Sequence, residues 1–234
     1  GDDMNINYPY GTTLAAGNAA TGAVAIMEPC PLTALGMRNR LIESCGLQPD
    51  NVRQVTNLVA LRALFTQHTH RLLVMDLCGK SELVLDGFRL IADVRESSPD
   101  TAIIICTALD EPRLLRQLIA SGIRGLMLKQ EPAIALTHCV QQVLAGCSSF
   151  SHRVRQRQLH EATADKPLTA KELDVLTQLF SGKSVTSVAL TMCRDIRTVS
   201  THKRNAMLKL GFHSDGELYL QGKWMAAQGS SFVR

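Results

Sequence analysis

The stretch that decides the fold class is Thr101-Ala102-Ile103-Ile104-Ile105-Cys106, an almost continuous apolar run. Similar short apolar runs stand at residues 23–27, 71–75 and 123–128. Helical apolar spacing separates or follows these runs, at residues 34–46, at 86–97, in a segment that stops at Gly122, and at about 132–145. Apolar strands that alternate with helices predict a parallel sheet covered on both faces. We therefore expect an α/β domain with a doubly wound parallel sheet that contains these four strands.

Three polar residues each come directly after one of these predicted strands. They are Asp76, Thr107 and Lys129. In a parallel sheet the functional crevice lies beyond the carboxyl ends of the strands, so these side chains should meet there. An acid, a hydroxyl and an amine at one edge fit a site that accepts a phosphoryl group.

This arrangement resembles the receiver domain of bacterial response regulators over roughly residues 23–147, and the resemblance implies a doubly wound parallel sheet of five strands. The resemblance implies that Asp76 is the phosphoacceptor, Thr107 the switch hydroxyl and Lys129 the invariant lysine. The family ends its first strand with two acidic residues that hold Mg²⁺, but this sequence has Glu28-Pro29. Mg²⁺ requires oxygen ligands, and a proline side chain supplies none.

The segment after Asp76 also departs from the family, because Cys78-Gly79-Lys80 replaces the usual Met-Pro pair. Lys80 is expected to place a positive charge near Asp76. Two interpretations stay open. The site is either a degenerate phosphorylation site (Asp76, Glu28, Thr107 and Lys129) in a phosphorylation-independent domain, or a working site of an ordinary phosphorylation-dependent regulator.

The C-terminal third predicts four short helices. Thr169 and Glu172 form a capping-box pattern, and Gly182 is expected to end the first helix. Further helices are expected at about 185–192, at 199–210 with Thr198 as N-cap, and at about 214–226. A tight turn between the second and third helices is typical of a helix-turn-helix domain.

Positive charge is concentrated in the same region. Residues 1–150 carry 12 Lys and Arg against 14 Asp and Glu, whereas residues 151–234 carry 13 against 7. A basic module attached to a neutral one suits a polyanion-binding domain. The predicted third helix combines short polar groups with cations, as major-groove insertion requires. The expected DNA-binding residues are Ser200, Thr201, Lys203, Arg204, Lys209 and Arg197.

Residues 168–211 closely resemble the LuxR-type DNA-binding domain. The matching positions are Thr169, Glu172, Val175, Leu176, Gly182, Ala189, Thr198, Val199, His202, Lys209, Leu210 and Gly211. A receiver joined to such a domain is typical of NarL/FixJ-type transcription factors. Among these, the sequence most resembles RcsB-like regulators and their receiver-degenerate relatives such as BglJ. The resemblance implies a homodimer or a heterodimer with an RcsB-like regulator on double-stranded DNA.

Composition narrows the remaining function classes. The sequence has no run of eighteen apolar residues, and its seven cysteines form no C-x-x-C pair, so we interpret them as reduced and core-like. His68 and His70 are interpreted as a solvated loop rather than a metal site. We expect no metal, cofactor, small-molecule substrate, membrane partner or catalytic residue. A small-molecule sensor would need an aromatic-lined pocket, and the sequence does not indicate one. The basic recognition helix argues against a pure adaptor that has lost DNA contact.

The sequence thus predicts a cytoplasmic, nucleoid-associated transcription regulator, an activator that is not an enzyme. Its expected divisions are a tail with tag remnant at 1–22, a receiver-like domain at 23–147, a linker at 148–166 and a DNA-binding domain at 167–230. Gly1, Asp2 and Asp3 precede Met4 and are assigned to the remnant.

Overall fold

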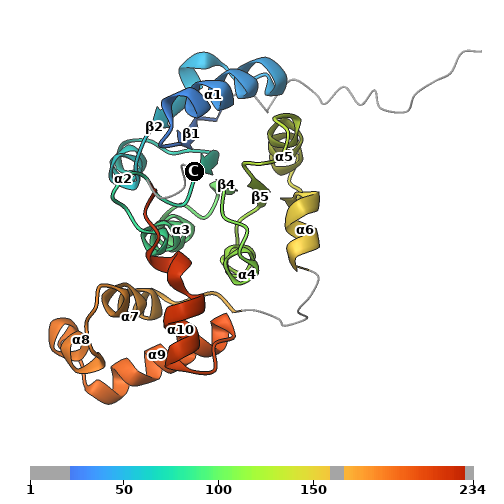
Figure 1. The fold of residues 1–234 in the computed structure, drawn as a ribbon. Helices are drawn as coiled ribbons and strands as arrows, with labels where there is room; N and C mark the ends of the chain where they lie inside the picture. Colours follow the sequence, from blue (N-terminus) through green and yellow to red (C-terminus); the bar gives the residue numbers. More distant parts are fainter. Residues whose placement is uncertain (1–21, 159–165, 230–234) are drawn as a thin grey trace, which may run out of the picture.

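The structure is a computed structural model that describes residues 22–158 and 166–229. Nearly all of the expected tail lies outside the described residues, as do residues 159–165 of the expected linker. Figure 1 shows two parts, a sheet with its helices and a smaller group of helices from α7 onward. We call them the sheet domain, residues 22–158, and the helical domain, residues 166–229.

The sheet domain is built on a parallel sheet with the strand order β2-β1-β3-β4-β5-β6. Its strands are β1 (Val24–Met27), β2 (Val52–Val55), β3 (Leu72–Met75), β4 (Ala102–Thr107), β5 (Gly125–Leu128) and β6 (Ser149–Phe150). The expected doubly wound parallel sheet is confirmed, and β6 adds a two-residue edge strand to the five expected. The sequence did not predict β2, because the strand has no apolar run and only Val52 of its four residues is buried.

Helices cover both faces of the sheet. Helices α1 (Pro31–Cys45) and α5 (Ile134–Leu144) pack on one face, where residues such as Ile26 and Val74 point. The other face carries α2 (Leu58–Gln67), α3 (Val84–Ser97) and α4 (Pro112–Ala120). Neighbouring strand residues point to opposite faces, which is why the strands are apolar at every position.

The segment predicted to be a linker is partly folded into the sheet domain. After β6 comes α6 (His152–Gln158), whose Val154 has no exposed surface and joins the core on the α2–α4 face. One buried valine among basic residues is too weak a pattern to predict such docking. The sheet domain therefore extends about ten residues beyond its expected end at residue 147.

The helical domain contains α7 (Ala170–Phe180), α8 (Val185–Met192), α9 (Ile196–Leu210), α10 (Asp215–Gln221) and the 3-10 helix η2 (Lys223–Ala226). Thr169 caps α7 as expected, accepting a hydrogen bond from the Glu172 amide at 3.2 Å. The expected start of α9 is wrong. Its N-cap is Asp195, which accepts from the Arg197 amide, and Thr198 lies within the first turn.

The two domains share one apolar core. Buried residues of α7, α9 and η2 belong to the same cluster as those of α3 and α4. Polar bonds join the same elements, since Arg89 of α3 donates to Asp174 of α7 at 2.8 Å and Gln117 of α4 donates to the Lys209 carbonyl at 3.3 Å. In the described parts of the chain no helix has the length and apolar character needed to cross a membrane.

Candidate nucleic-acid interface and carboxyl-edge pocket

The helix-turn-helix is formed by α8, a turn and α9. The turn depends on Cys193, which adopts the left-handed conformation with φ 52° and ψ 45° and so reverses the chain. Ser184 caps α8 with its hydroxyl, and Asp195 caps α9 with its carboxylate. Gly211, at φ 74°, ends α9 in a conformation that a residue with a Cβ rarely adopts.

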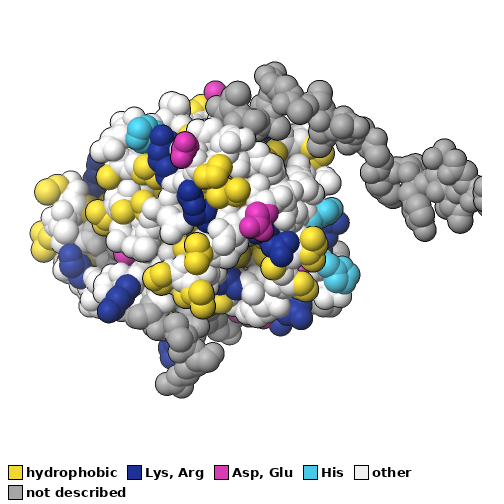
Figure 2. All heavy atoms as spheres, turned by 90° about the horizontal axis from the view of Figure 1, so that it is seen from above, with side chains coloured by type: hydrophobic (Ala, Val, Ile, Leu, Met, Phe, Trp, Pro, Cys, Tyr) yellow, Lys and Arg dark blue, Asp and Glu magenta, His cyan; other side chains and the backbone are white. Residues whose placement is uncertain are grey.

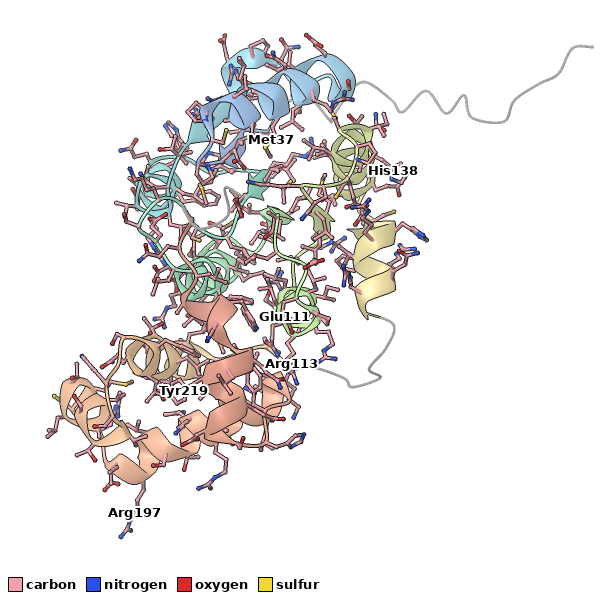
Figure 3. All side chains as sticks on the ribbon, viewed as in Figure 1. Met37, Glu111, Arg113, His138, Arg197 and Tyr219 are labelled. Carbon is pink, nitrogen blue, oxygen red and sulfur yellow. The ribbon has the colours of Figure 1, made fainter. Side chains whose placement is uncertain are left out.

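One stripe of α9 faces solvent. Arg197, Thr201 and Arg204 are exposed and lie at helical spacing on that stripe. Figure 3 shows the Arg197 side chain pointing away from the protein at the far end of the helical domain. These three predicted residues therefore lie on the solvent-facing side of α9, where the Thr201 hydroxyl donates to the Arg197 carbonyl at 2.9 Å. The exposed Asn205 continues the stripe and was missed, although its spacing from Arg197 and Thr201 could have indicated it.

The other three predicted DNA-binding residues are less available. Ser200 is half-buried. Lys203 forms an ion pair with Asp215 at 3.0 Å and leaves 14% of its side chain exposed. Lys209 donates to a Glu172 carboxylate oxygen at 2.6 Å and to the Pro167 carbonyl at 3.1 Å. The Lys209 ammonium thus holds the end of α9 to the start of α7.

Glu172 explains this pairing. Its side chain is 4% exposed, and a buried carboxylate needs a cation or hydrogen-bond donors. The Thr169 hydroxyl donates to it at 3.0 Å and Lys209 supplies the charge. In a full capping box the Glu172 carboxylate would accept from the Thr169 backbone amide, but here it accepts from the Thr169 hydroxyl and from the Lys209 ammonium.

The carboxyl edge of the sheet does gather the four residues predicted there. Glu28 follows β1, Asp76 follows β3, Thr107 ends β4 and Lys129 follows β5. All except Lys129 are buried, with 1% of Glu28 and 7% of Asp76 exposed. We call these four residues the carboxyl-edge pocket.

Lys129 bridges the two acids of this pocket. Its Nζ lies 2.6 Å from Asp76 Oδ2 and 2.8 Å from Glu28 Oε2. The other Asp76 oxygen accepts from the Leu77 amide at 2.7 Å. Burial opposes the charge of Lys129, but the two carboxylates raise its pKa overall. Burial raises the pKa of Glu28, although Lys129 counters this. The cluster is therefore an ion-paired unit with two acids and one base.

Lys80 does not join this cluster. Its side chain is exposed, and within the described residues the ion pair of Asp76 is with Lys129. The cation paired with Asp76 is thus Lys129. Thr107 is fully enclosed, and its hydroxyl accepts from the Leu109 amide at 3.0 Å. This bond orders the loop that leads to α4.

The donor set does not fit Mg²⁺ as it stands. The position after Glu28 is Pro29, which offers no side-chain oxygen, and Lys129 occupies oxygens of both carboxylates. Across residues 22–158 and 166–229, no three His, Cys, Asp or Glu side chains are placed to hold a metal.

The cysteine and histidine interpretations are partly wrong. All seven cysteines are free, but only three are buried, namely Cys78, Cys106 and Cys139. Among the histidines, His70 is not in a solvated loop. It is 5% exposed and stacks on Phe65 with ring centroids 4.5 Å apart.

A parallel sheet of receiver order joined to a four-helix domain with a solvent-facing basic recognition helix defines a class, the DNA-binding response regulators. Residues 166–221 match the bacterial regulatory proteins of the luxR family, and this domain belongs to that family. The chain as a whole is a DNA-binding transcription regulator of the RcsB type with a receiver domain.

Two relatives illustrate the likeness in sequence. RcsB of Escherichia coli K12 is 29% identical over 201 residues, which cover 82% of this chain and 89% of RcsB. The oxygen regulatory protein NreC of Staphylococcus epidermidis is 29% identical over 168 residues, covering 65% of this chain and 75% of NreC. These relatives are transcriptional or oxygen regulatory proteins by name.

Solved structures of RcsB share the fold. RcsB from Salmonella enterica serovar Typhimurium, bound to promoter rprA with the phosphomimetic BeF₃⁻, gives a TM-score of 0.61 at 26% identity, covering 87% of this chain and 98% of that chain. Another structure of RcsB from Salmonella typhimurium gives a TM-score of 0.55 at 27% identity, covering 87% of this chain and 99% of that chain.

Proposed function

We propose that this protein is a sequence-specific transcription activator whose receiver-like domain works without phosphorylation and serves for dimerisation. The observation that carries the proposal is the ion-paired pocket, where Lys129 is already paired with both Asp76 and Glu28. A phosphoryl donor brings negative charge toward Asp76, and Mg²⁺ ordinarily relieves that repulsion. Here the ligand set for Mg²⁺ lacks one carboxylate, and the lysine is tied to both acids.

The test is direct. Incubation with acetyl phosphate and Mg²⁺ should leave the mass of the protein unchanged. Asp76→Ala should retain regulation of a reporter promoter to within the change that its stability causes. A phosphorylated species that Asp76→Ala abolishes, together with stronger DNA binding, would instead establish the alternative, an ordinary phosphorylation-dependent regulator using Asp76.

DNA reading is assigned to the exposed stripe of α9. We propose that Arg197, Thr201 and Arg204 contact base edges, while Ser200 and Lys203 contribute from the flank of the helix. A guanidinium can bind a guanine edge with two parallel hydrogen bonds. Arg204→Ala should cost about 1–3 kcal/mol on the preferred operator and little on random DNA. Equal weakening on both DNAs would show that Arg204 contacts phosphate.

The dimerisation surface is assigned to the face formed by α1 and α5. Leu32, Leu35 and Ile134 expose 78%, 50% and 64% of their surfaces there. Figure 2, a view from the α1 side, shows hydrophobic side chains among cations on this face, and in Figure 3 Met37 and His138 mark the two helices. Apolar side chains grouped on one face indicate an interaction site.

The partner is either a second copy or an RcsB-like regulator. Sizing the protein alone and with an RcsB-like partner, with and without operator DNA, distinguishes the two. Leu35→Glu should abolish the dimer, whereas Val59→Glu on α2, which is 73% exposed on a different helix, should not. A monomeric wild-type protein in all four mixtures would refute the dimer.

Activation and a nucleoid-associated, cytoplasmic site of action are proposed from the likeness to RcsB-type regulators. Deletion of the gene should lower transcription from its target promoter, and a rise would identify a repressor. The homologues are regulators by name, and we propose no enzymatic activity for the chain.

A further inference from the structure

The last described residues of the chain return to the sheet domain. After α10, residues 222–229 of the helical domain run back to the sheet domain, and Gln228 forms an isolated antiparallel bridge with Leu83. In Figure 1 the red end of the ribbon runs from η2 along α3 toward the sheet domain. We call residues 222–229 the latch segment.

The latch segment completes the start of α3. The first amides of a helix have no partner inside it, and a side-chain oxygen at the N-cap normally receives one of them. The N-cap of α3 is Leu83, which has no such oxygen. The amide of Val84, a residue with no exposed surface, instead donates to the Ala227 carbonyl at 3.1 Å. The segment thus caps this helix with its own backbone.

Side chains anchor the segment on either side of this bond. Met225 has no exposed surface and lies in the shared core. The Trp224 ring packs against Phe88 of α3, with centroids 6.4 Å apart. At the far end the backbones of Gly229 and Gly79 touch, since a Cβ on Gly229 would lie 2.4 Å from the Gly79 carbonyl oxygen.

The surface that receives the segment is the loop after Asp76. This loop is held by Glu82, whose carboxylate accepts from the Gly79 amide at 2.7 Å and from the Leu58 amide at 2.8 Å. At its start, Asp76 is fixed by Lys129 and bonds the Leu77 amide. The carboxyl-edge pocket and the latch contact therefore lie at two ends of one short, well-bonded loop.

The docking leaves the recognition stripe open. The helical domain meets the sheet domain through α7, η2 and the residues after α9, where the Arg113 guanidinium lies 4.8 Å over the Phe212 ring. Arg197 and Arg204 remain exposed. The contact thus determines where the DNA-reading helix is placed, and it does not cover that helix.

We propose that residues 222–229 are a latch that binds the loop and helix start at residues 79–84 and thereby fixes the DNA-binding domain in one position on the receiver-like domain. The latch is constitutive, because its receiving loop is already held by the Lys129–Asp76 pair and by Glu82. The latch and the loop that receives it belong to the same chain.

A matched pair of glycine variants tests the contact. Neither Gly229 nor Gly216 has a positive φ, so alanine strains neither backbone. A Cβ at Gly229 meets backbone atoms of the 78–79 loop, whereas a Cβ at Gly216 meets only the Ser214 hydroxyl at 3.7 Å. Gly229→Ala should open the latch, and Gly216→Ala should not. A chain that ends at Ala226 removes the capping carbonyl outright.

Two readouts report the latch without a label. Trp224 is the only tryptophan of the chain, so its quenching by acrylamide follows docking of the segment. Hydrogen exchange at the Val84 amide follows the capping bond. Both should rise in Gly229→Ala and in the shortened chain, with exchange faster by about five- to thirtyfold. Unchanged quenching and exchange in a shortened chain with wild-type circular dichroism would overturn the latch.

The consequence for DNA binding rests on the proposed dimer. With both reading helices fixed, the protein should prefer one spacing of two half-sites, near one helical turn or a multiple of it. The shortened chain should bind a single half-site as the wild type does, while the preference for spacing falls at least about threefold. An opened latch with unchanged spacing preference would refute the positioning role, whereas a monomer would refute the dimer alone.

Discussion

Replacing Lys129 by methionine is the most informative perturbation of the carboxyl-edge pocket. The substitution keeps the aliphatic stem and removes one charge. Two carboxylates that now lie 2.8 Å and 2.6 Å from that ammonium would face each other inside the protein without a cation. The sequence predicted this neighbourhood from strand ends, but only the geometry shows how completely Lys129 serves both acids.

The expected loss of stability is large. Removing one partner of a buried ion pair typically costs about 3–5 kcal/mol, because the remaining charge has lost its compensation. Glu28 is 1% exposed and cannot recover the loss by moving into water. The lysine itself is 25% exposed, which places the expected cost at the lower end, about 3 kcal/mol, or a fall in Tm of roughly 10 °C.

The effect should depend on pH in a defined direction. Burial already raises the pKa of Glu28 above its ordinary value of 4.5, and Lys129 opposes that rise. Without the lysine the pKa of Glu28 in the folded protein rises further. A raised folded pKa favours folding at low pH, and this contribution is lost as pH rises through the folded pKa. Lys129→Met should therefore be most unstable at pH 8 and recover toward pH 5.

Urea unfolding of the full chain at pH 5 and pH 8, followed by circular dichroism, measures both quantities. Lys80→Met is the matched control, since Lys80 is exposed and should change stability by less than about 0.5 kcal/mol. Adding Glu28→Gln to Lys129→Met should restore at least half of the loss. A cost below about 1 kcal/mol at pH 8, with no recovery at pH 5, would refute the reasoning.

Three further predictions concern other buried groups. Burial, with Arg53 nearby, lowers the pKa of His70 from 6.5 to about 4, so the protein takes up a proton on unfolding between these pH values. The free energy of unfolding should therefore fall by about 2–3 kcal/mol as pH drops from 6.5 to 4. His70→Phe keeps the ring stacking and should flatten this dependence in urea titrations from pH 7 to 4. Lys209→Met should lower the stability of the helical domain by about 2–4 kcal/mol, because Glu172 loses its cation. An unchanged urea midpoint of unfolding, together with a reduced salt dependence of DNA binding, would instead show that Lys209 contacts phosphate. In the native protein at pH 8 a thiol reagent should modify the exposed cysteines and leave the buried ones, whose pKa values burial raises to about 11 or 12, until denaturant is added; the exposed set is Cys30, Cys147 and Cys193, and the buried set is Cys78, Cys106 and Cys139.

The sheet could be predicted because its strands are buried on both faces. β3 and β4 are apolar at nearly every position, and this pattern depends only on local sequence. β2 escaped prediction because it is an edge strand with one buried residue, and α6 because it docks through Val154 alone. Their placement depends on contacts with distant segments, which local periodicity does not record.

The carboxyl-edge pocket was predictable for a different reason. Parallel strands bring their carboxyl ends to one edge, so residues that follow strands meet whatever the detailed packing. This rule placed Asp76, Thr107 and Lys129 correctly. It could not place Lys80, whose direction depends on the conformation of the loop rather than on a strand.

The recognition helix α9 shows that counting cations in the sequence does not identify which of them face solvent. The sequence marks Lys203, Arg204 and Lys209 alike as cations near one helix. Whether each faces DNA depends on which acids the fold brings beside it. Asp215 reaches Lys203 from α10 and Glu172 reaches Lys209 from α7, while Arg204 meets neither. A tertiary ion pair thus makes Lys209 a link between helices, which its place in the sequence does not indicate.

The proposed phosphorylation-independent role of the receiver-like domain agrees with the bonding around Asp76. A phosphorylation switch needs an acceptor whose loop can take up two arrangements, with free energies close enough for one phosphoryl group to exchange them. Here the acceptor loop is bonded at both ends, by Lys129 to Asp76 and by Glu82 to Gly79, and the latch segment adds a third contact at Val84. Each bond favours the arrangement that is already present. The loop is therefore built to hold one position, which is the property required of a domain that dimerises and places a DNA-reading helix.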